Sequence, residues 1–198
     1  MTKNLSTLIP KVLEVARQAA HAIMEVRSNK NFNVKNKHDL SPVTEADLLA
    51  NQILEAGLKS IKPGIPVLSE ENETIPYEER KRWSSFWLVD PLDGTKEFIT
   101  GSEDFTVNIA LIEHHQPVLG VVAVPALQHF YWGCQNQGAY FQQQDNEPEQ
   151  IHVRSKLSYP LKIAVSRSHD KSRSSNAKWN AFIEHFKEVE FVYRGSAL

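Results

Sequence analysis

The sequence predicts a mixed α and β protein in which two amphipathic helices come first and a sheet follows. In the first sixty residues, apolar side chains recur at three- and four-residue steps, a spacing typical of helices that pack on one face. After Pro63 and Gly64 the pattern changes to short runs rich in β-branched and apolar residues that end at turn signals, as strands do. The change in period therefore places the helices before the sheet.

The first helix is expected over residues 5–26 and the second over residues 45–61. Ser6 or Thr7 could cap the first, and Pro10 is tolerated if it falls in the first turn. The segment Thr44-Glu-Ala-Asp47 fits a capping box at the start of the second helix, with Asp in place of the usual Glu.

A run of predicted strands follows, with mostly short connections between them. In chain order the expected strands are 66–69, 86–90, 105–113, 118–124, 128–133, 138–141 and 151–154, followed by 161–166, a helix over 174–186, and a last strand over 190–193. The polar segment 142–150 is the expected joint between two units. We therefore expect an N-terminal α+β domain over residues 1–145, and the start of a C-terminal α/β domain over residues 146–198.

Composition excludes several classes of protein. The formal net charge is −2, so the chain gives no reason to expect a nucleic acid polymer as partner. Its one cysteine, Cys134, cannot form an internal disulfide, which favours a reducing compartment. The longest uncharged apolar run, 117–127, is too short to span a bilayer as a helix. We expect a cytoplasmic protein, leave peripheral association at the inner membrane open, and predict no oligomeric state.

Carboxylates gather where two of the predicted strands end. Glu70 follows the strand at 66–69, and Asp90 and Asp93 flank a predicted Pro-Leu turn that could aim both side chains at one point. The carbonyl of Leu92 would lie on the same side. Such oxygens suit Mg²⁺, and without a cation the three negative charges would repel one another. The set therefore predicts a magnesium site, which could in turn bind phosphate.

Each acidic segment also has an ordinary structural explanation. Asp-Gly is a common turn signal, Asp-Pro commonly ends a strand, and the Glu70-Glu71 pair could be a solvated turn. For any one segment the structural explanation is favoured. Taken jointly, in this order and each at a strand end or helix start, they favour a functional site.

The segment from Asp90 to Thr95, Asp-Pro-Leu-Asp-Gly-Thr, resembles the signature of the inositol monophosphatase superfamily. The segments around Thr44 and Glu70 match two further motifs of that superfamily, and the similarity runs over essentially the whole chain. The resemblance implies a layered α-β-α-β-α fold, of the kind found in sugar phosphatases, whose second unit is incomplete here. It also implies two or more Mg²⁺ ions and the protein groups that hold them. They are Glu70, Asp90, the carbonyl of Leu92, and Asp93.

The same resemblance assigns the catalytic and substrate-binding groups. Asp47 and Thr95 would orient the attacking water and help to deprotonate it, and the amides of Gly94 and Thr95 would hold the phosphate. Glu70, Leu92 and Asp93 would contact the substrate as well as the metal. Lithium is expected to inhibit, since it could occupy a magnesium position without supplying the same charge.

Two segments resemble the 3'(2'),5'-bisphosphate nucleotidases of the CysQ type within this superfamily. They are Thr95-Lys-Glu-Phe98 and a Ser-Arg-Ser-His turn in which Arg167, Ser168 and His169 would hold the nucleoside part of the substrate. This implies hydrolysis of the 3'-phosphate of adenosine 3',5'-bisphosphate to AMP and phosphate, a step of sulfur metabolism. An imidazole can stack on an adenine face, although a solvated loop is the ordinary explanation for His169.

Two alternatives remain open. The chain could act on inositol or sugar monophosphates, or it could be an incomplete relative that binds metal and anion without turnover. In the superfamily a further segment follows the strand that ends near Tyr193; it begins with a Gly-Ser element and supplies another Asp ligand. We expect the chain to be truncated before that Asp, to bind its second Mg²⁺ weakly, to turn over poorly and to aggregate.

Overall fold

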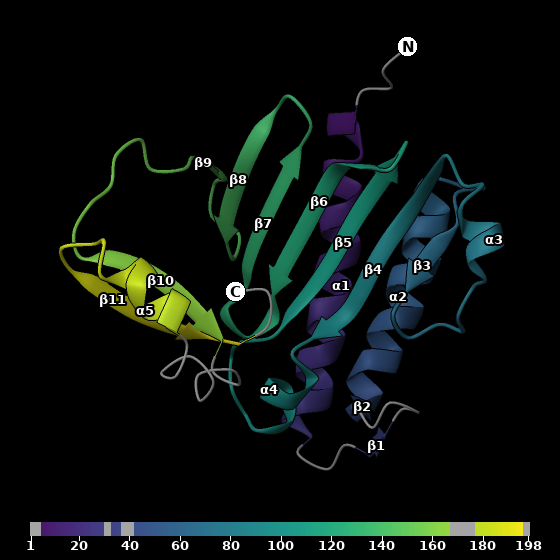
Figure 1. Cartoon of the computed structure of the whole chain (residues 1–198). Coiled ribbons are helices and arrows are strands. Elements are labelled where there is room, and N and C mark those ends of the chain that lie inside the picture. Colours follow the sequence, from purple (N-terminus) through teal and green to yellow (C-terminus); the bar gives the residue numbers. More distant parts are fainter. Residues whose placement is uncertain (1–4, 30–32, 37–41, 167–176, 196–198) are drawn as a thin grey trace.

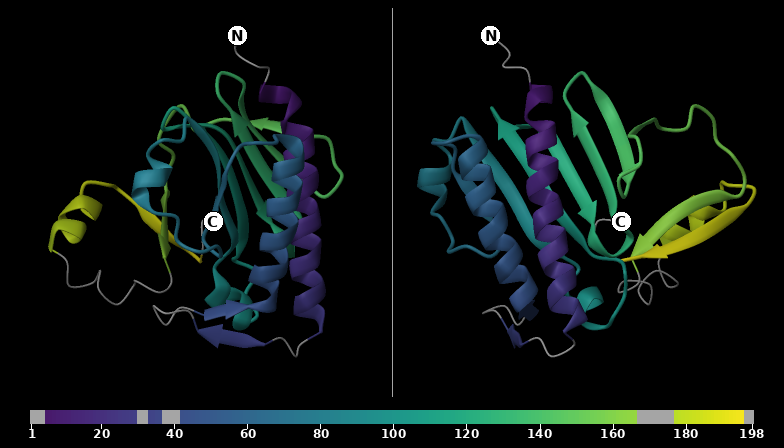
Figure 2. Two further views of the ribbon diagram at one scale, coloured as in Figure 1. Left: turned by 90° about the vertical axis from the view of Figure 1, so that its right-hand side faces the viewer. Right: turned by 180° about the vertical axis from the view of Figure 1, so that it is seen from behind.

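A computed structural model describes residues 5–29, 33–36, 42–166 and 177–195. Two long helices lie against one face of a broad sheet, and a smaller sheet projects from one end of the molecule (Figure 1 and Figure 2). This arrangement confirms the predicted mixed fold, with helices first and the sheet after them.

The two long helices are α1 (Ile9–Ser28) and α2 (Glu45–Ile61). A short 3-10 turn, η1 (Leu5–Thr7), precedes α1, whose N-cap residue is Leu8 and makes no side-chain capping bond. The predicted cap at Ser6 or Thr7 is therefore wrong. Pro10 lies in the first turn of α1 as expected; it has no amide hydrogen, so that position needs no capping acceptor.

Helix α2 starts as predicted. It follows the short hairpin of β1 (Val34–Asn36) and β2 (Pro42–Thr44), and its first turn carries the complete capping box between Thr44 and Asp47. The backbone amide of Ala46 donates to the Thr44 hydroxyl, and the Asp47 carboxylate accepts from the Thr44 amide. Asp47 is thereby fixed at the helix start with its side chain fully buried.

In the described part of the chain, seven strands form one sheet in the order β3-β4-β5-β6-β7-β8-β9. Their bounds are β3 Val67–Ser69, β4 Ser85–Asp93, β5 Thr106–Glu113, β6 Gln116–Val124, β7 His129–Cys134, β8 Gly138–Gln143 and β9 Glu149–Ile151. The β3–β4 pair is parallel and every later pair is antiparallel. Short helical segments α3 (Tyr77–Arg80), α4 (Thr95–Ile99) and η2 (Pro125–Leu127) join the strands.

The structure corrects two details of the predicted sheet. Residues 152–154 are not in a strand, because β9 ends at Ile151 after pairing with β8. The predicted turn between Asp90 and Asp93 is instead a register shift within β4: Asp90 pairs with Asn108, and pairing resumes where Asp93 meets Thr106. The strand therefore bends at the Pro-Leu pair without ending there, as a bulge allows.

The core lies between the two long helices and the sheet. Alternate residues of β4 and β5 face α1 and α2, and Trp87, Val107 and Leu111 among them are completely buried. Gly57 of α2 packs against Val15 of α1 so closely that an added Cβ would lie 2.6 Å from the valine. This contact brings the two helix backbones together and fixes both over the sheet.

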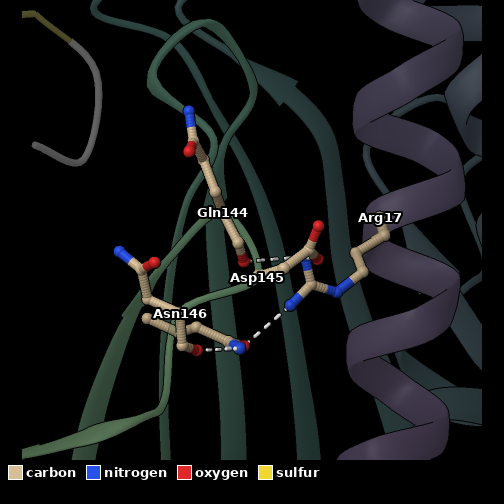
Figure 3. A network of polar contacts seen from close by, with 5 residues as sticks. Arg17, Gln144, Asp145 and Asn146 are labelled. Carbon is tan, nitrogen blue, oxygen red and sulfur yellow. Dashed lines mark hydrogen bonds and ion pairs between the residues drawn. The ribbon is translucent and has the colours of Figure 1, made fainter.

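A polar network ties α1 to the hairpin of β7 and β8 (Figure 3). The Arg17 guanidinium lies 4.1 Å from the centroid of the Phe130 ring and donates hydrogen bonds to Oε1 of Gln142 at 2.7 Å and to the carbonyl of Gln144 at 3.4 Å. Oδ1 of Asp145 lies 3.9 Å from Nη1 of Arg17. We call Arg17, Phe130, Gln142, Gln144 and Asp145 the Arg17 network.

Beyond the main sheet, β10 (Leu161–Ser166) and β11 (Val189–Arg194) form a separate parallel pair, with α5 (Ala177–Ile183) between them in sequence. The predicted strands at 161–166 and 190–193 are confirmed. The predicted helix was longer than α5, and residues 174–176 of it lie outside the described residues. The main sheet ends with β9, and the next strand, β10, belongs to the smaller sheet. The division into domains 1–145 and 146–198 stays a prediction. None of the described helices is long and apolar enough to cross a membrane.

Candidate active site

Two of the predicted carboxylates lie side by side because β3 and β4 run in parallel. Ser69, the last residue of β3, pairs with Val89 within β4, and the amide of Glu70 donates to the carbonyl of Val89 at 3.2 Å. Glu70, directly after β3, therefore lies beside Asp90 of β4. The carboxyl end of a parallel strand is where α/β sheets open to ligands.

The surroundings of Asp90 disfavour its charged form. Burial above all, and then the nearby charges of Glu70 and Asp93 and a hydrogen bond with the Glu70 side chain, raise the pKa of Asp90 from 3.8 to about 7. Its Oδ1 atom is buried and has no hydrogen-bond partner among the described residues. A buried acceptor without a donor costs stability unless something else fills that position.

The donor set fits a hard cation. Carboxylate oxygens from Glu70, Asp90 and Asp93 and the carbonyl of Leu92 are the kind of ligand that Mg²⁺ prefers, and the orphaned Asp90 oxygen would gain a partner. In the described residues, however, no three His, Cys, Asp or Glu side chains are already gathered around one point as metal ligands. The ligand set therefore stays a prediction, and a cation would have to draw the carboxylates closer together.

The catalytic pair expected from the resemblance is in contact. The Thr95 hydroxyl lies 3.0 Å from Oδ1 of Asp47 and 3.2 Å from the carbonyl of Leu92, two acceptors for its single hydrogen. The other carboxylate oxygen, Oδ2 of Asp47, accepts from the amide and the hydroxyl of Thr44, at 2.8 and 2.6 Å. Asp47 thus orients Thr95 while the capping box holds Asp47.

Gly94 and Thr95 begin α4 at a small pocket. Gly94 has φ of +91°, a left-handed conformation that costs a glycine little and that would strain other residues. The pocket has a volume of about 180 Å³, and its lining residues include Glu70, Gly94, Thr95 and Glu97. It therefore joins the predicted phosphate-binding turn to one of the predicted metal ligands.

A larger cavity of about 720 Å³ adjoins the same carboxylates on the face of the sheet away from α1 and α2. Its lining includes Glu70 and Asp90, and also Asn108 and Arg80, which the sequence did not single out. A buried side-chain atom of each of the latter two lacks a hydrogen-bond partner in the described part of the chain. The one sequence signal for Asn108 is a polar side chain that lies between apolar neighbours in the strand. For Arg80 we find none.

The predicted nucleoside contacts cannot be placed. Arg167, Ser168 and His169 lie outside the described residues, which resume at residue 177. Strand β10, which leads into this segment, ends at Ser166 as predicted. The assignment of His169 to a base therefore stays a prediction.

Comparison with known proteins gives consistent matches. The model of the family described as "Inositol monophosphatase family" matches residues 4–196. Two bacterial relatives named 3'(2'),5'-bisphosphate nucleotidase CysQ, from Escherichia coli O6:H1 and Salmonella typhimurium, are 40% and 44% identical over 192 residues. Each alignment covers 96% of this chain and 74% of the relative.

Solved structures agree with this result. The crystal structure of CysQ from Bacteroides thetaiotaomicron, described as a bacterial member of the inositol monophosphatase family, aligns with a TM-score of 0.78 and 28% identity, covering 98% of this chain and 74% of that one. The extragenic suppressor protein suhB from Bartonella henselae aligns with a TM-score of 0.74 and 26% identity, covering 96% and 71%.

Proposed function

Because the chain belongs to the inositol monophosphatase family, we propose that it is a magnesium-dependent phosphomonoesterase that hydrolyses the 3'-phosphate of adenosine 3',5'-bisphosphate. In this reaction a bond forms between water oxygen and phosphorus, the bond from phosphorus to the 3' oxygen breaks, and AMP leaves with a 3' hydroxyl. The observation that carries the proposal is the Thr95–Asp47 hydrogen bond, formed at a pocket that Glu70 and Gly94 also line.

The residues proposed to hold Mg²⁺ are Glu70, Asp90 and Asp93 with the carbonyl of Leu92. When bound, Mg²⁺ supplies positive charge that makes water a better nucleophile and stabilises a leaving oxygen. The buried oxygen of Asp90 that lacks a partner among the described residues and the raised pKa of its carboxyl support this assignment, because a cation would offset both.

Thr95 is proposed to take a proton from the attacking water while its own hydroxyl proton passes to the Asp47 carboxylate. Its one hydrogen points to Asp47 or to the carbonyl of Leu92, so the lone pairs of its oxygen remain available to accept. Asp47 is suited to orient this hydroxyl because its other oxygen is already held by Thr44. The amides of Gly94 and Thr95 at the pocket are proposed to hold the phosphate.

The nucleotide substrate is proposed from the relatives. The two bacterial proteins named CysQ are called bisphosphate nucleotidases, and they share about two fifths of their aligned residues with this chain. An inositol or sugar monophosphate is the alternative substrate. Binding of Mg²⁺ and phosphate without turnover is the outcome that would favour a non-catalytic relative.

Phosphate release from adenosine 3',5'-bisphosphate and from inositol 1-phosphate, with and without excess EDTA, tests the proposal. We expect faster release from the nucleotide, no release in EDTA, and lithium inhibition. Thr95→Val should lower kcat by about 100-fold, whereas Thr95→Ser, which keeps the hydroxyl, should retain most of the rate. Equal rates for Thr95→Val and the unaltered protein would contradict the proposed role of this hydroxyl.

A further inference from the structure

Asp104, which lies between α4 and β5, joins two distant parts of the chain. It is 4% exposed. Its Oδ2 accepts a hydrogen bond of 3.1 Å from the amide of Gly195, directly after β11, and its Oδ1 lies 3.6 Å from the Arg194 guanidinium. Asp104 is thus a buried carboxylate that binds the end of the smaller sheet to the main sheet, across 91 positions of sequence.

The loop that carries Asp104 is bonded in turn to α4. The amide of Asp104 donates to the hydroxyl of Ser102, and the amide of Ser102 donates to the carbonyl of Glu97 at 2.9 Å. From the other side, Arg27 at the end of α1 donates to the carbonyl of Gly101 at 2.7 Å. The part of the loop next to α4 is therefore bonded to both helices, and a displacement of Asp104 would be passed on to α4 through Ser102.

Gly195 also contacts α4 directly. A Cβ added to Gly195 would lie 2.6 Å from Cγ of Glu97 and 2.9 Å from its Oε1. Glu97 lines the same small pocket as Glu70, Gly94 and Thr95. The backbone after β11 thus packs on a side chain that lines the proposed phosphate pocket, and a side chain at position 195 would have to displace the Glu97 side chain.

We infer that Asp104 is a positioning residue: it holds Gly195 against Glu97 and so fixes the shape of the pocket at the start of α4. The inference rests on the proposed function, because it gives that pocket its role in binding phosphate. Asp104 itself does not line the pocket, so its effect has to travel through Gly195 and Glu97. The expected consequence of losing it is weaker phosphate binding from a loosened wall.

The test compares Asp104→Ala with Asp104→Asn by NMR and by calorimetry with inorganic phosphate and Mg²⁺. Alanine removes the acceptor of the Gly195 amide, whereas asparagine keeps a carbonyl oxygen for it. In Asp104→Ala we expect the Gly195 amide to exchange at least tenfold faster, the amide signals of residues 94–97 to shift, and phosphate affinity to fall roughly tenfold. In Asp104→Asn each change should be smaller.

Two further variants complete the experiment. Glu190→Gln removes the partner of Lys162 in an exposed ion pair within the smaller sheet, and should leave the signals of residues 94–97 unchanged. Gly195→Ala should shift them while Asp104 is intact, because its Cβ would displace Glu97. This variant decides the question if Asp104→Ala fails to fold.

The amide signals decide the inference separately from the proposed function. Unchanged signals at residues 94–97 in both Asp104→Ala and Gly195→Ala would overturn the positioning role. Shifted signals would support it even if the unaltered protein bound no phosphate, and that result would count against the proposed function alone.

Discussion

Charged groups are compensated in the Arg17 network but not in the carboxylate cluster, which consists of Glu70, Asp90 and Asp93. In the Arg17 network a cation has an aromatic face, two hydrogen-bond acceptors and a carboxylate within reach. In the carboxylate cluster like charges lie together, one buried oxygen has no partner among the described residues, and the pKa of Asp90 is about 7. The first arrangement stabilises the fold; the second lowers its stability, as groups committed to function often do.

The largest expected effect comes from removing a carboxylate of the cluster. Asp93→Asn should lower phosphate release by more than about 100-fold, because Asp93 is proposed to contact the metal directly and its loss should exceed the 10–100-fold typical of outer partners. The free energy of unfolding should change little, since relief of charge repulsion offsets any lost contact. Comparing the rate and the thermal midpoint of this variant with those of the unaltered protein checks both parts. A variant that unfolds along with its loss of rate would show that the cluster is structural.

The next effect is on the Arg17 network. Arg17→Ala should reduce the free energy of unfolding by about 1–3 kcal/mol, through lost packing on Phe130 and lost hydrogen bonds to a partly buried site. Urea unfolding measures this, with Lys11→Ala, an exposed residue of the same helix, as the matched control. A loss as small as that of Lys11→Ala would remove the contrast between the two regions.

A third prediction concerns pH in the absence of metal. Between pH 4 and 7 the unfolded chain releases the proton of Asp90, whose ordinary pKa is 3.8, while the folded chain keeps it. Folding therefore retains a proton, and the contribution of Asp90 to the free energy of unfolding should fall as pH rises through this window and level off above 7. Subtracting the pH profile of Asp90→Asn from that of the unaltered protein, by urea unfolding in EDTA, isolates this term. A difference that does not change with pH would contradict the raised pKa.

The smallest effect is expected where charges are paired but exposed. Lys59 and Glu55 lie 2.7 Å apart on α2, with the lysine side chain 58% exposed. Lys59→Ala should cost no more than about 0.5 kcal/mol, because solvent screens such pairs. Urea unfolding at low and high salt checks this, and a cost close to that of Arg17→Ala would mean that burial does not explain the Arg17 network.

How far the sequence predicts these features depends on whether the signal is local. The capping box of Thr44 and Asp47 spans four residues, so its motif could be recognised directly, and the strands could be recognised from the spacing of their apolar residues. No local pattern indicates that Thr95 is a second partner of Asp47, because the two residues are 48 positions apart. Only the resemblance to a family pairs them in advance of the structure.

The errors have the same origin. Asp-Pro-Leu-Asp carries strong turn signals, yet the pairing of Asp93 with Thr106 keeps the segment within β4. The contact between Asp104 and Gly195 has no local signal, since the two residues lie 91 positions apart and the Gly-Ser element that begins at Gly195 does not indicate Asp104 as its partner. Tertiary pairing thus overrides local preference, or adds contacts that local preference cannot indicate.

The most direct test of whether the carboxylate cluster binds a cation measures Mg²⁺ binding together with the protons that binding releases. Calorimetry at about pH 6 in two buffers with different ionisation enthalpies gives both quantities at once. We expect the unaltered protein to bind Mg²⁺ and release close to one proton, and Asp90→Asn to bind more weakly and release almost none. Equal affinity and equal proton release in the two proteins would contradict the proposal that Asp90 holds the metal.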